Sequence, residues 1–154
     1  MAVEIVAPTP EALAYLAEHL REQDRVEVEA VGRSVHQAVR ESVEHSKATY
    51  IACEDGVPIA VFGHAEYGSL LAPVGVPWLL GTDGVRRNRR VLQRFARQYI
   101  ESLLAEYPRL MNAVHAENSV SIAWLRRLGF ELHAPVRVPP HGALFHRFEM
   151  IRHV

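Results

Sequence analysis

The sequence lacks several features that would restrict where and how the protein works. Its 154 residues include one cysteine, Cys53, so no disulfide can form within the chain. No stretch approaches the ~20 apolar residues needed to cross a bilayer. The opening segment, MAVEIVAPTP, has neither the charged start nor the apolar run of a signal peptide. We therefore expect a cytoplasmic protein without a membrane partner.

An excess of charge of one sign is also missing. Seventeen Lys and Arg stand against 18 Asp and Glu, which leaves a net charge of -1. Domains that bind nucleic acid usually carry a basic excess or a basic face. We therefore expect no nucleic-acid partner, and any basic function has to be local.

Grouped metal ligands are absent from the sequence as well. The chain has nine histidines, but His141 and His146 lie in and after a loop without further ligands at the spacing of a zinc site. Cys53 lies on a predicted strand beside Asp55 and has no basic neighbour to activate it, so we expect a small buried residue rather than a nucleophile. The sequence thus predicts no metal site.

What the chain does have is enough apolar residues, 49%, for one core, and we predict a single domain over residues 1–154. The pattern predicts an α/β (α+β) fold with a mixed, mostly antiparallel sheet of six or seven strands and about four helices. Only the fourth and fifth strands are expected to be parallel neighbours, because a long helix crosses between them. The expected helices span residues 9–20, 34–46, 89–107 and 118–129, and the expected strands span residues 3–7, 49–53, 58–67, 76–81, 109–116, 130–133 and 144–154.

The segment NSVSIAWLRRLGF, residues 118–130, is the most specific motif in the chain. Asn118 can cap a helix, Ser121 leaves room beside it, Gly129 can stop the helix in a left-handed turn, and Phe130 can start a core strand. With the order of the predicted elements, this segment resembles the second conserved motif of the general amino-acid N-acyltransferase (GNAT) fold. The resemblance implies acetyl-CoA or another acyl-CoA as cofactor and a small amine as acceptor.

A narrower resemblance covers nearly the full length. PWLLGTD, the arginine-rich start of the long helix, NAVHAENSVSIAWLRRLGF and HGALFHRFEM together resemble a family of small GNAT-like proteins of short-tailed bacteriophages. Members of that family are implicated in virion morphogenesis or internal-core assembly. This resemblance implies phage structural proteins as partners, inside a bacterial host or in a virion.

The GNAT resemblance also assigns residues to the cofactor. It places the backbone of Leu79, Leu80 and Gly81 beside the acyl and pantetheine portion, Asn118 beside the arm, and Arg86, Arg87, Arg89 and Arg90 beside the phosphates. The family's turn usually carries paired glycines that let a phosphate approach the backbone, and these glycines are absent here. Four cations at a helix N-terminus oppose the helix dipole, so an anion bound nearby would explain them.

The proton-transfer groups are less well defined by the sequence. Many GNAT enzymes have a tyrosine seven positions after the motif's asparagine, where this chain has Leu125. Tyr67 or Tyr99 are substitutes, although Tyr99 lies on an apolar stripe and is expected in the core. The candidate bases are His64 and Glu66, two positions apart on one strand face, and His115 near the parting of the fourth and fifth strands. The alternative for these histidines is a structural hydrogen bond.

Two functional hypotheses therefore stay open. In the first, the protein binds an acyl-CoA or a related anion between the fourth and fifth strands and catalyses weak or atypical acyl transfer. In the second, it is a non-catalytic phage assembly factor that uses the fold as a scaffold. The motif at residues 118–130 and the cationic turn favour the first hypothesis, while the missing glycines and Leu125 favour the second.

Overall fold

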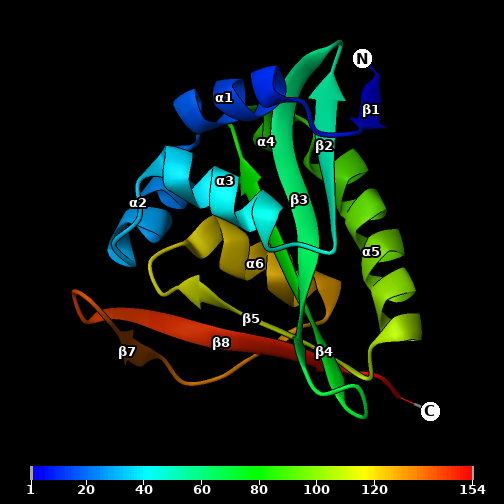
Figure 1. Ribbon diagram of the computed structural model, residues 1–154, viewed down its shortest axis with the longest axis vertical. Coiled ribbons are helices and arrows are strands. Elements are labelled where there is room, and N and C mark those ends of the chain that lie inside the picture. Colours follow the sequence, from blue (N-terminus) through cyan, green and yellow to red (C-terminus); the bar gives the residue numbers. More distant parts are fainter. Residues whose placement is uncertain (1, 154) are drawn as a thin grey trace.

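A computed structural model describes residues 2–153 of the chain. Helices and strands are mixed along these residues, with three helices between the first two strands and none between the second, third and fourth (Figure 1). The elements are β1 (Val3–Val6), α1 (Pro10–Glu18), α2 (Glu22–Ala30), α3 (Val35–Glu44), β2 (Ala48–Glu54), β3 (Val57–Gly68), β4 (Pro73–Gly81), α4 (Gly84–Arg87), α5 (Arg89–Glu106), β5 (Arg109–His115), α6 (Ser119–Leu128), β6 (Glu131–Leu132), β7 (Val136–Val138) and β8 (Ala143–Ile151).

One mixed sheet forms the centre of the fold. Its strand order is β1-β2-β3-β4-β5-β8-β6, with β7 paired to β8. All neighbouring strands are antiparallel except β4 and β5, which are parallel, so the predicted fold class and the predicted parallel pair are confirmed. Over the described residues the sheet has eight strands rather than six or seven, because β7 forms in the segment expected to be a loop.

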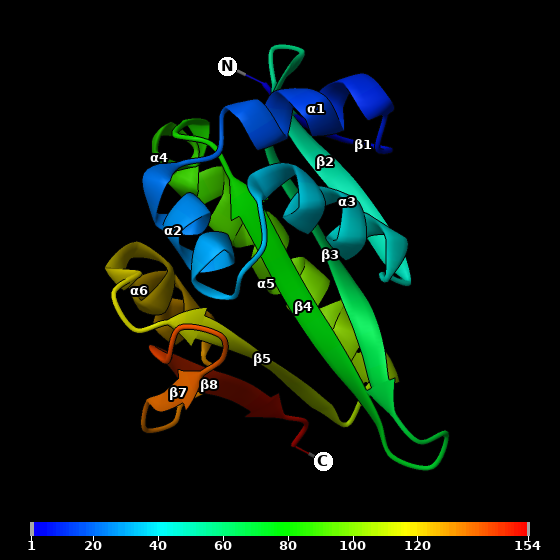
Figure 2. The same cartoon turned by 60° about the vertical axis from the view of Figure 1, so that its left-hand side comes forward.

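Helices cover both faces of the sheet. Figure 2 shows α1, α2 and α3 on one face of β2, β3 and β4, with α5 and α6 behind the sheet. On the first face, buried Leu16 and Ala38 pack against Ile51 and Val61. On the other face, Leu103 packs with Leu110, Phe130 and Phe148, among others. The helices were predicted from apolar stripes, and these stripes are the surfaces that they bury.

Two helices lie outside the expected set. The first, α2, occupies a stretch that the sequence analysis left as a polar interval, because its inward face is mostly polar and apolar periodicity cannot detect it. The second, α4, is a single turn of four residues directly before α5. In the described part of the chain, no helix has the length and apolarity needed to span a membrane.

The helix ends predicted from the sequence are confirmed. Helix α5 begins at Arg89 and ends at Glu106, two residues before Pro108. Helix α6 is capped by Asn118, whose side-chain oxygen accepts the amide hydrogen of Ser121 at 3.2 Å. Gly129 then adopts a φ of 102°, the left-handed conformation that favours glycine, and stops the helix.

Strands β4 and β5 pair over a very short distance and then diverge (Figure 2). The pairing consists of Val74 with Arg109 and Gly75 with Leu110. Beyond it, the carbonyl of Pro77 accepts a hydrogen bond from the Asn112 side-chain amide at 2.8 Å. Proline has no amide hydrogen, so no donor of Pro77 is left unpaired where the strands separate. The sheet therefore opens into a gap toward the C-terminal ends of both strands.

We expect Gly75→Ala to destabilise the fold by about 1–3 kcal/mol, because overpacking a buried site costs that much. An added Cβ would lie 2.8 Å from Leu110 Cδ2 and 2.9 Å from Tyr107 Cδ2, and both side chains are buried. The check is urea unfolding of the parent and the variant. Leu70→Ala is the control: Leu70 is 98% exposed, and its loss should change the unfolding free energy by less than about 0.5 kcal/mol. An unchanged midpoint for Gly75→Ala would show that the strand junction is not tightly packed.

Candidate functional site

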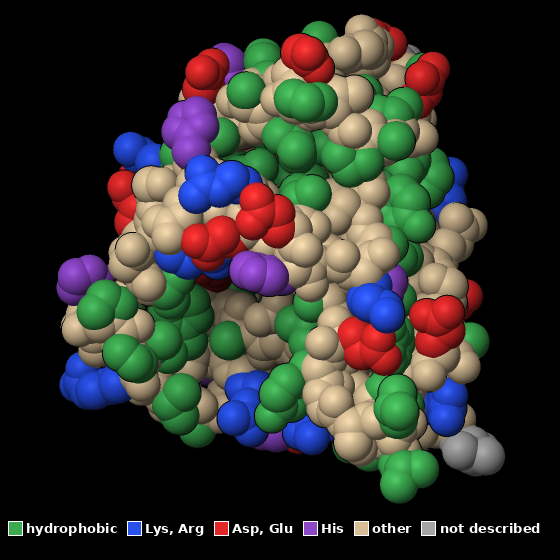
Figure 3. Space-filling view, in the orientation of Figure 1, with side chains coloured by type: hydrophobic (Ala, Val, Ile, Leu, Met, Phe, Trp, Pro, Cys, Tyr) green, Lys and Arg blue, Asp and Glu red, His purple; other side chains and the backbone are tan. Residues whose placement is uncertain are grey.

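The gap between β4 and β5 holds a cavity of about 370 Å³. Residues of α2 and α3 line it on one side of the sheet, and residues of α5 and α6 line it on the other. The cavity therefore passes through the sheet where the two strands diverge. On the α2–α3 side, the surface is hollowed between these helices and β8 (Figure 3).

The edge of β4 is exposed to this cavity. Gly81 donates its N–H to Asp24 Oδ2 at 2.8 Å and accepts the N–H of Arg21 at 2.9 Å, so both of its backbone groups point away from β3. Backbone groups two residues apart on an antiparallel strand point to the same edge. The N–H and C=O of Leu79 therefore face the gap, and Leu79 and Leu80 both line the cavity. Of the three residues whose backbone was predicted beside the cofactor, Leu79 faces the gap, Leu80 pairs with Val61 of β3, and the backbone of Gly81 is bonded to Asp24 and Arg21.

A polar face of α2 closes one end of the gap. Arg21, Asp24 and Glu27 follow one another at a spacing of three residues and so share one side of the helix. Arg21 Nε donates to Asp24 Oδ2 at 2.9 Å, and Arg21 Nη2 donates to Ser121 Oγ at 3.2 Å. Asn118 donates to Asp24 Oδ1 at 3.4 Å. This network joins α2 to β4 and to the start of α6.

Asp24 is only 1% exposed, and burial raises the pKa of its carboxyl group. The positive charge of Arg21 and the hydrogen bonds from Gly81 and Asn118 act in the opposite direction. Asn118, which the family resemblance assigns to the cofactor arm, therefore has both ends of its side chain in use, one on the helix cap and the other on Asp24. It does not line the cavity.

Glu27 is the one carboxylate among the cavity-lining residues of the described chain. Its Oε1 accepts the backbone N–H of His115 at 2.6 Å. Burial, helped by the negative charge of Asp24, raises the pKa of Glu27 to about 7, against the opposing effects of the His115 amide, the Asn118 side chain and Arg21. A group with this pKa exchanges a proton near neutral pH.

The predicted base His115 has a different position. Its ring stacks edge-on against Phe145 with centroids 5.1 Å apart, and its Nδ1 accepts the N–H of Glu117 at 3.1 Å. The ring is absent from the cavity wall, and only the backbone of His115 contributes to the site, through Glu27. Among the described residues, the carboxylate of Glu27 therefore lines the gap, where the sequence analysis had expected the ring of His115.

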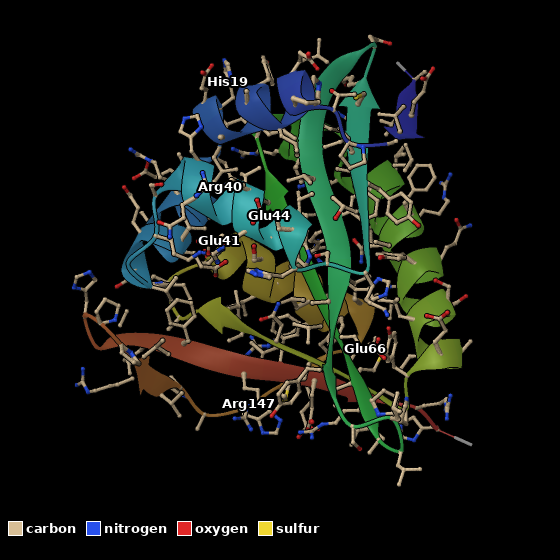
Figure 4. The ribbon with its side chains drawn as sticks, in the orientation of Figure 1. His19, Arg40, Glu41, Glu44, Glu66 and Arg147 are labelled. Atoms are coloured by element: carbon tan, nitrogen blue, oxygen red, sulfur yellow. The ribbon has the colours of Figure 1, made fainter. Side chains whose placement is uncertain are left out.

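The structure does not bring His64 or Glu66 to the cavity. His64 Nδ1 lies 2.6 Å from the hydroxyl of Tyr99, and burial lowers the pKa of its imidazole. Glu66 forms an ion pair with Lys47 at 3.1 Å, and Figure 4 shows it on the lower part of β3, away from the hollow. The two side chains share a strand face as expected, but β3 lies one strand away from the gap. The period of two along a strand shows which side chains share a face, but it does not show how far the strand lies from the gap.

The arginine-rich turn lies at the start of α5 and lines a shallow hollow of its own. The first helical hydrogen bond joins the N–H of Leu92 to the C=O of Asn88 at 2.9 Å. The amides of Arg89, Arg90 and Val91 precede this bond and so have no acceptor inside α5, and the side chain of the N-cap residue Asn88 does not cap the helix. Asn88 instead donates to Glu54 and to the carbonyl of Gly84, both at 2.9 Å.

Of the four predicted arginines, Arg87 is already paired with Glu54 at 2.9 Å. Glu54 is buried, and the hydrogen bonds from Arg87 and Asn88 lower its pKa. Arg86, Arg89 and Arg90 are exposed around the same hollow and form no ion pair with any residue of the described chain. Three cations and three free amides thus converge on one surface.

Other predicted residues divide between the cavity wall and the core. Leu125 lines the cavity, and so does Tyr99, which was expected in the core. The predicted site did not include Trp78 and Trp124, which line the cavity as well. Burial raises the pKa of Tyr99, whose hydroxyl is bonded to His64. Cys53 is buried, and burial raises the pKa of its thiol, which fits the predicted structural role.

The sequence analysis missed the polar face of α2. One pattern points to it in retrospect: Arg21, Asp24 and Glu27 recur every three residues in a stretch of charged residues that form helices well. A search for apolar stripes passes over such a helix. Among the described residues, no group of three or more His, Cys, Asp or Glu is placed to hold a metal ion.

No family model matches the sequence, and no curated protein matches it either. The solved structures that share this fold include acetyltransferases. A structure of the NatC complex bound to Gag peptide and CoA matches with a TM-score of 0.73 and 13% identity, over 99% of this chain and 100% of that one. AAC(6')-Ib in complex with ribostamycin and coenzyme A matches with a TM-score of 0.69 and 19% identity, over 99% and 94%. A GNAT-family acetyltransferase from Streptococcus pneumoniae matches with a TM-score of 0.63 and 12% identity, over 98% and 100%.

At these identities the comparisons establish the fold, and the chain has the GNAT fold of the acetyltransferases. The wider resemblance found in the sequence is therefore confirmed at the level of the fold. Nothing in the comparisons supports the narrower resemblance to proteins of short-tailed bacteriophages, which stays a prediction.

We expect Glu27→Gln to stabilise the protein above pH 7 by up to about 3 kcal/mol, since each pKa unit corresponds to 1.36 kcal/mol. The folded-state pKa of about 7 lies above the ordinary value of 4.5, so the folded state binds the proton more tightly, and the parent loses stability as pH rises from about 4.5 to 7. The amide of glutamine still offers an oxygen to the N–H of His115.

Denaturant unfolding at pH 5, 6, 7 and 8 checks this prediction. The difference between the parent and Glu27→Gln should be largest at pH 8 and small at pH 5. Glu29→Gln, at an exposed position on the same helix, is the control and should give a curve parallel to that of the parent. A constant difference across this range would mean that Glu27 does not titrate there.

Proposed function

We propose that the protein is an N-acyltransferase that uses an acyl-CoA as donor, with the chain acting as one domain. One observation carries the proposal: the free edge of β4 at Leu79 borders a cavity that passes through the sheet. The solved structures with CoA bound share this fold, and CoA binding is a property of those proteins that we extend here by proposal.

The turn at the start of α5 fits the phosphates of such a donor. The free amides of Arg89, Arg90 and Val91 point out of a helix N-terminus, where an anion is favoured. The guanidinium groups of Arg86, Arg89 and Arg90 add charge-assisted hydrogen bonds. A bound phosphate also offsets the unfavourable interaction of these cations with the helix dipole. The arginines would thus hold the phosphate at a turn that lacks the paired glycines of the family.

The cavity fits the remainder of the donor. Leu79 offers one N–H and one C=O along the gap, and the walls on the α5–α6 side are apolar, with Leu92, Phe95, Trp124 and Leu125 among them. Bound there, an acyl-CoA supplies the acyl group as an activated thioester. The apolar walls exclude water and so protect that thioester from hydrolysis.

Leu125 limits the rate that we expect. It lies in the cavity wall where many enzymes of this fold have a tyrosine, and a leucine cannot protonate the leaving thiolate. General acid catalysis is typically worth ~10²–10⁴-fold, so turnover should be slow. The same position is the specific observation that favours the second candidate, a non-catalytic binding protein. For that candidate, phage assembly is supported by sequence resemblance alone.

Calorimetric titration with acetyl-CoA at low salt tests the proposal. We expect binding by the parent, and at least tenfold weaker binding by the double variant Arg89→Ala, Arg90→Ala, because two of the three free cations at the turn are lost. Arg87 is kept in this design because its removal would leave buried Glu54 without a cation.

The double variant Arg40→Ala, Arg126→Ala provides the control. It removes the same charge from exposed positions on α3 and α6 outside both hollows, and its affinity for acetyl-CoA should equal that of the parent. Equal weakening in both double variants would mean that the effect is one of net charge. No binding by the parent at high micromolar acetyl-CoA would contradict the proposed function.

A further inference from the structure

On the α2–α3 side, the cavity is lined by Glu27, Val28, Val31, Arg33, Ser42, Trp78, Val138 and Phe145, and we call this part of it the chamber. Trp78 lies on the same face of β4 as Leu80, two residues on, and both pack with the helices α1–α3. Phe145 is three residues from Phe148, which packs with α5, so Phe145 points to the opposite face, toward α2. The hollow in Figure 3 is the opening on this side.

The chamber combines apolar walls with one carboxylate. Three charged side chains line the whole cavity: Arg21, Glu27 and Arg33. Arg21 is paired with Asp24, and Arg33 is paired with Glu41 at 3.2 Å and also donates to the carbonyl of Ala38. Glu27 forms no ion pair within the described part of the chain and is held by the backbone N–H of His115.

The buried carboxylate of Glu27 is costly to keep charged because the neighbouring cation, Arg21, is already paired with Asp24, and a ligand that brings a cation relieves that cost. The aromatic rings of Trp78 and Phe145 provide faces on which either an ammonium group or an apolar group can lie. Of the residues that define the chamber, Glu27 alone has a negative charge that can fix an ammonium group, and Arg33 is paired with Glu41.

We propose that this chamber is the acceptor site, that it takes a primary amine on an apolar alkyl or arylalkyl body, and that Glu27 removes the proton of its ammonium group. This inference rests on the proposed function. It differs from what the aminoglycoside complex would suggest, because an aminoglycoside carries many hydroxyl and ammonium groups for which the chamber has few polar partners.

The proton and electron balance is simple. The ammonium N–H bond breaks, and its proton moves to the carboxylate of Glu27. The nitrogen lone pair then forms a bond to the thioester carbonyl carbon, and the C–S bond breaks as its electron pair leaves with sulfur. The second nitrogen proton passes to the thiolate or to water, and Glu27 returns its proton to solvent. The products are an amide and free CoA thiol.

The acceptor class is tested by acyl transfer from acetyl-CoA, followed by the release of free thiol. Hexylamine and benzylamine should react with a kcat/KM at least tenfold above that of ethanolamine, 6-aminohexanoate or ribostamycin. The 6-aminohexanoate probe has the six-carbon chain of hexylamine with its terminal methyl replaced by a carboxylate, and it is included because Arg33 Nε is buried without an acceptor among the described residues. Preference for that probe, for ethanolamine or for ribostamycin would overturn the acceptor class and leave acyl transfer standing.

The role of Glu27 is tested by Glu27→Gln, with Glu29→Gln as the matched control on the same helix. We expect kcat for hexylamine to fall at least 100-fold in Glu27→Gln, while the Kd of acetyl-CoA is unchanged and Glu29→Gln behaves as the parent. In the parent, the rate should rise with pH to a plateau above about 7, which is the pKa of Glu27. Burial raises this pKa, and Asp24, Arg21 and the N–H of His115 are the neighbouring groups that adjust it. A Glu27→Gln enzyme with the parent's rate or pH profile would overturn this role.

Binding of benzylamine without acetyl-CoA distinguishes a failure of the chamber from a failure of the proposed acyl transfer. Calorimetry at pH 8 should detect benzylamine binding to the parent, and Glu27→Gln should weaken it at least tenfold. If acetyl-CoA fails to bind while benzylamine still binds through Glu27, the chamber stands and the proposed acyl transfer fails. Absence of benzylamine binding at millimolar concentration, with acetyl-CoA binding intact, would overturn the chamber alone.

Discussion

The buried carboxylate of Asp24 holds the open part of the structure in place. It accepts hydrogen bonds from the backbone of Gly81 on β4, from Arg21 at the start of α2 and from Asn118 at the start of α6. At Gly81 the edge of β4 has lost its neighbour β5, and Asp24 satisfies an amide that would otherwise be unpaired. With Pro77 and Asn112 at the base of the gap, this contact satisfies the β4 backbone on either side of Leu79, whose N–H and C=O face the gap.

Much of the fold could be predicted because its strongest features are local. Residues a few positions apart determine the apolar stripe of α5, the Asn118 cap and the Gly129 stop. The main strands could likewise be placed along the chain from short local patterns. The parallel pairing of β4 and β5 followed from the long crossing helix between them. Together with the resemblance of residues 118–130 to the family's motif, these local features predicted the GNAT fold.

The site was less predictable because its main groups depend on contacts between distant segments. Glu27 has an unusual pKa only because the gap, Asp24 and the backbone of His115 surround it, and His115 is 88 residues away in sequence. His64 and Glu66 were reasonable from a period of two, but that period does not tell how far a strand lies from the gap. The role expected of Gly81 changed for a similar reason, since α2 was not predicted and occupies its backbone.

The cavity that crosses the sheet is lined on one side by residues of α5 and α6 and on the other by residues of α2 and α3. Under the proposed function, the donor and the acceptor would approach from opposite faces and would not compete for one opening. Both can then be bound at the same time, which corresponds to a sequential mechanism with a ternary complex. The steady-state consequence is a family of intersecting double-reciprocal lines, in contrast to the parallel lines of an enzyme that must release one product before the second substrate enters.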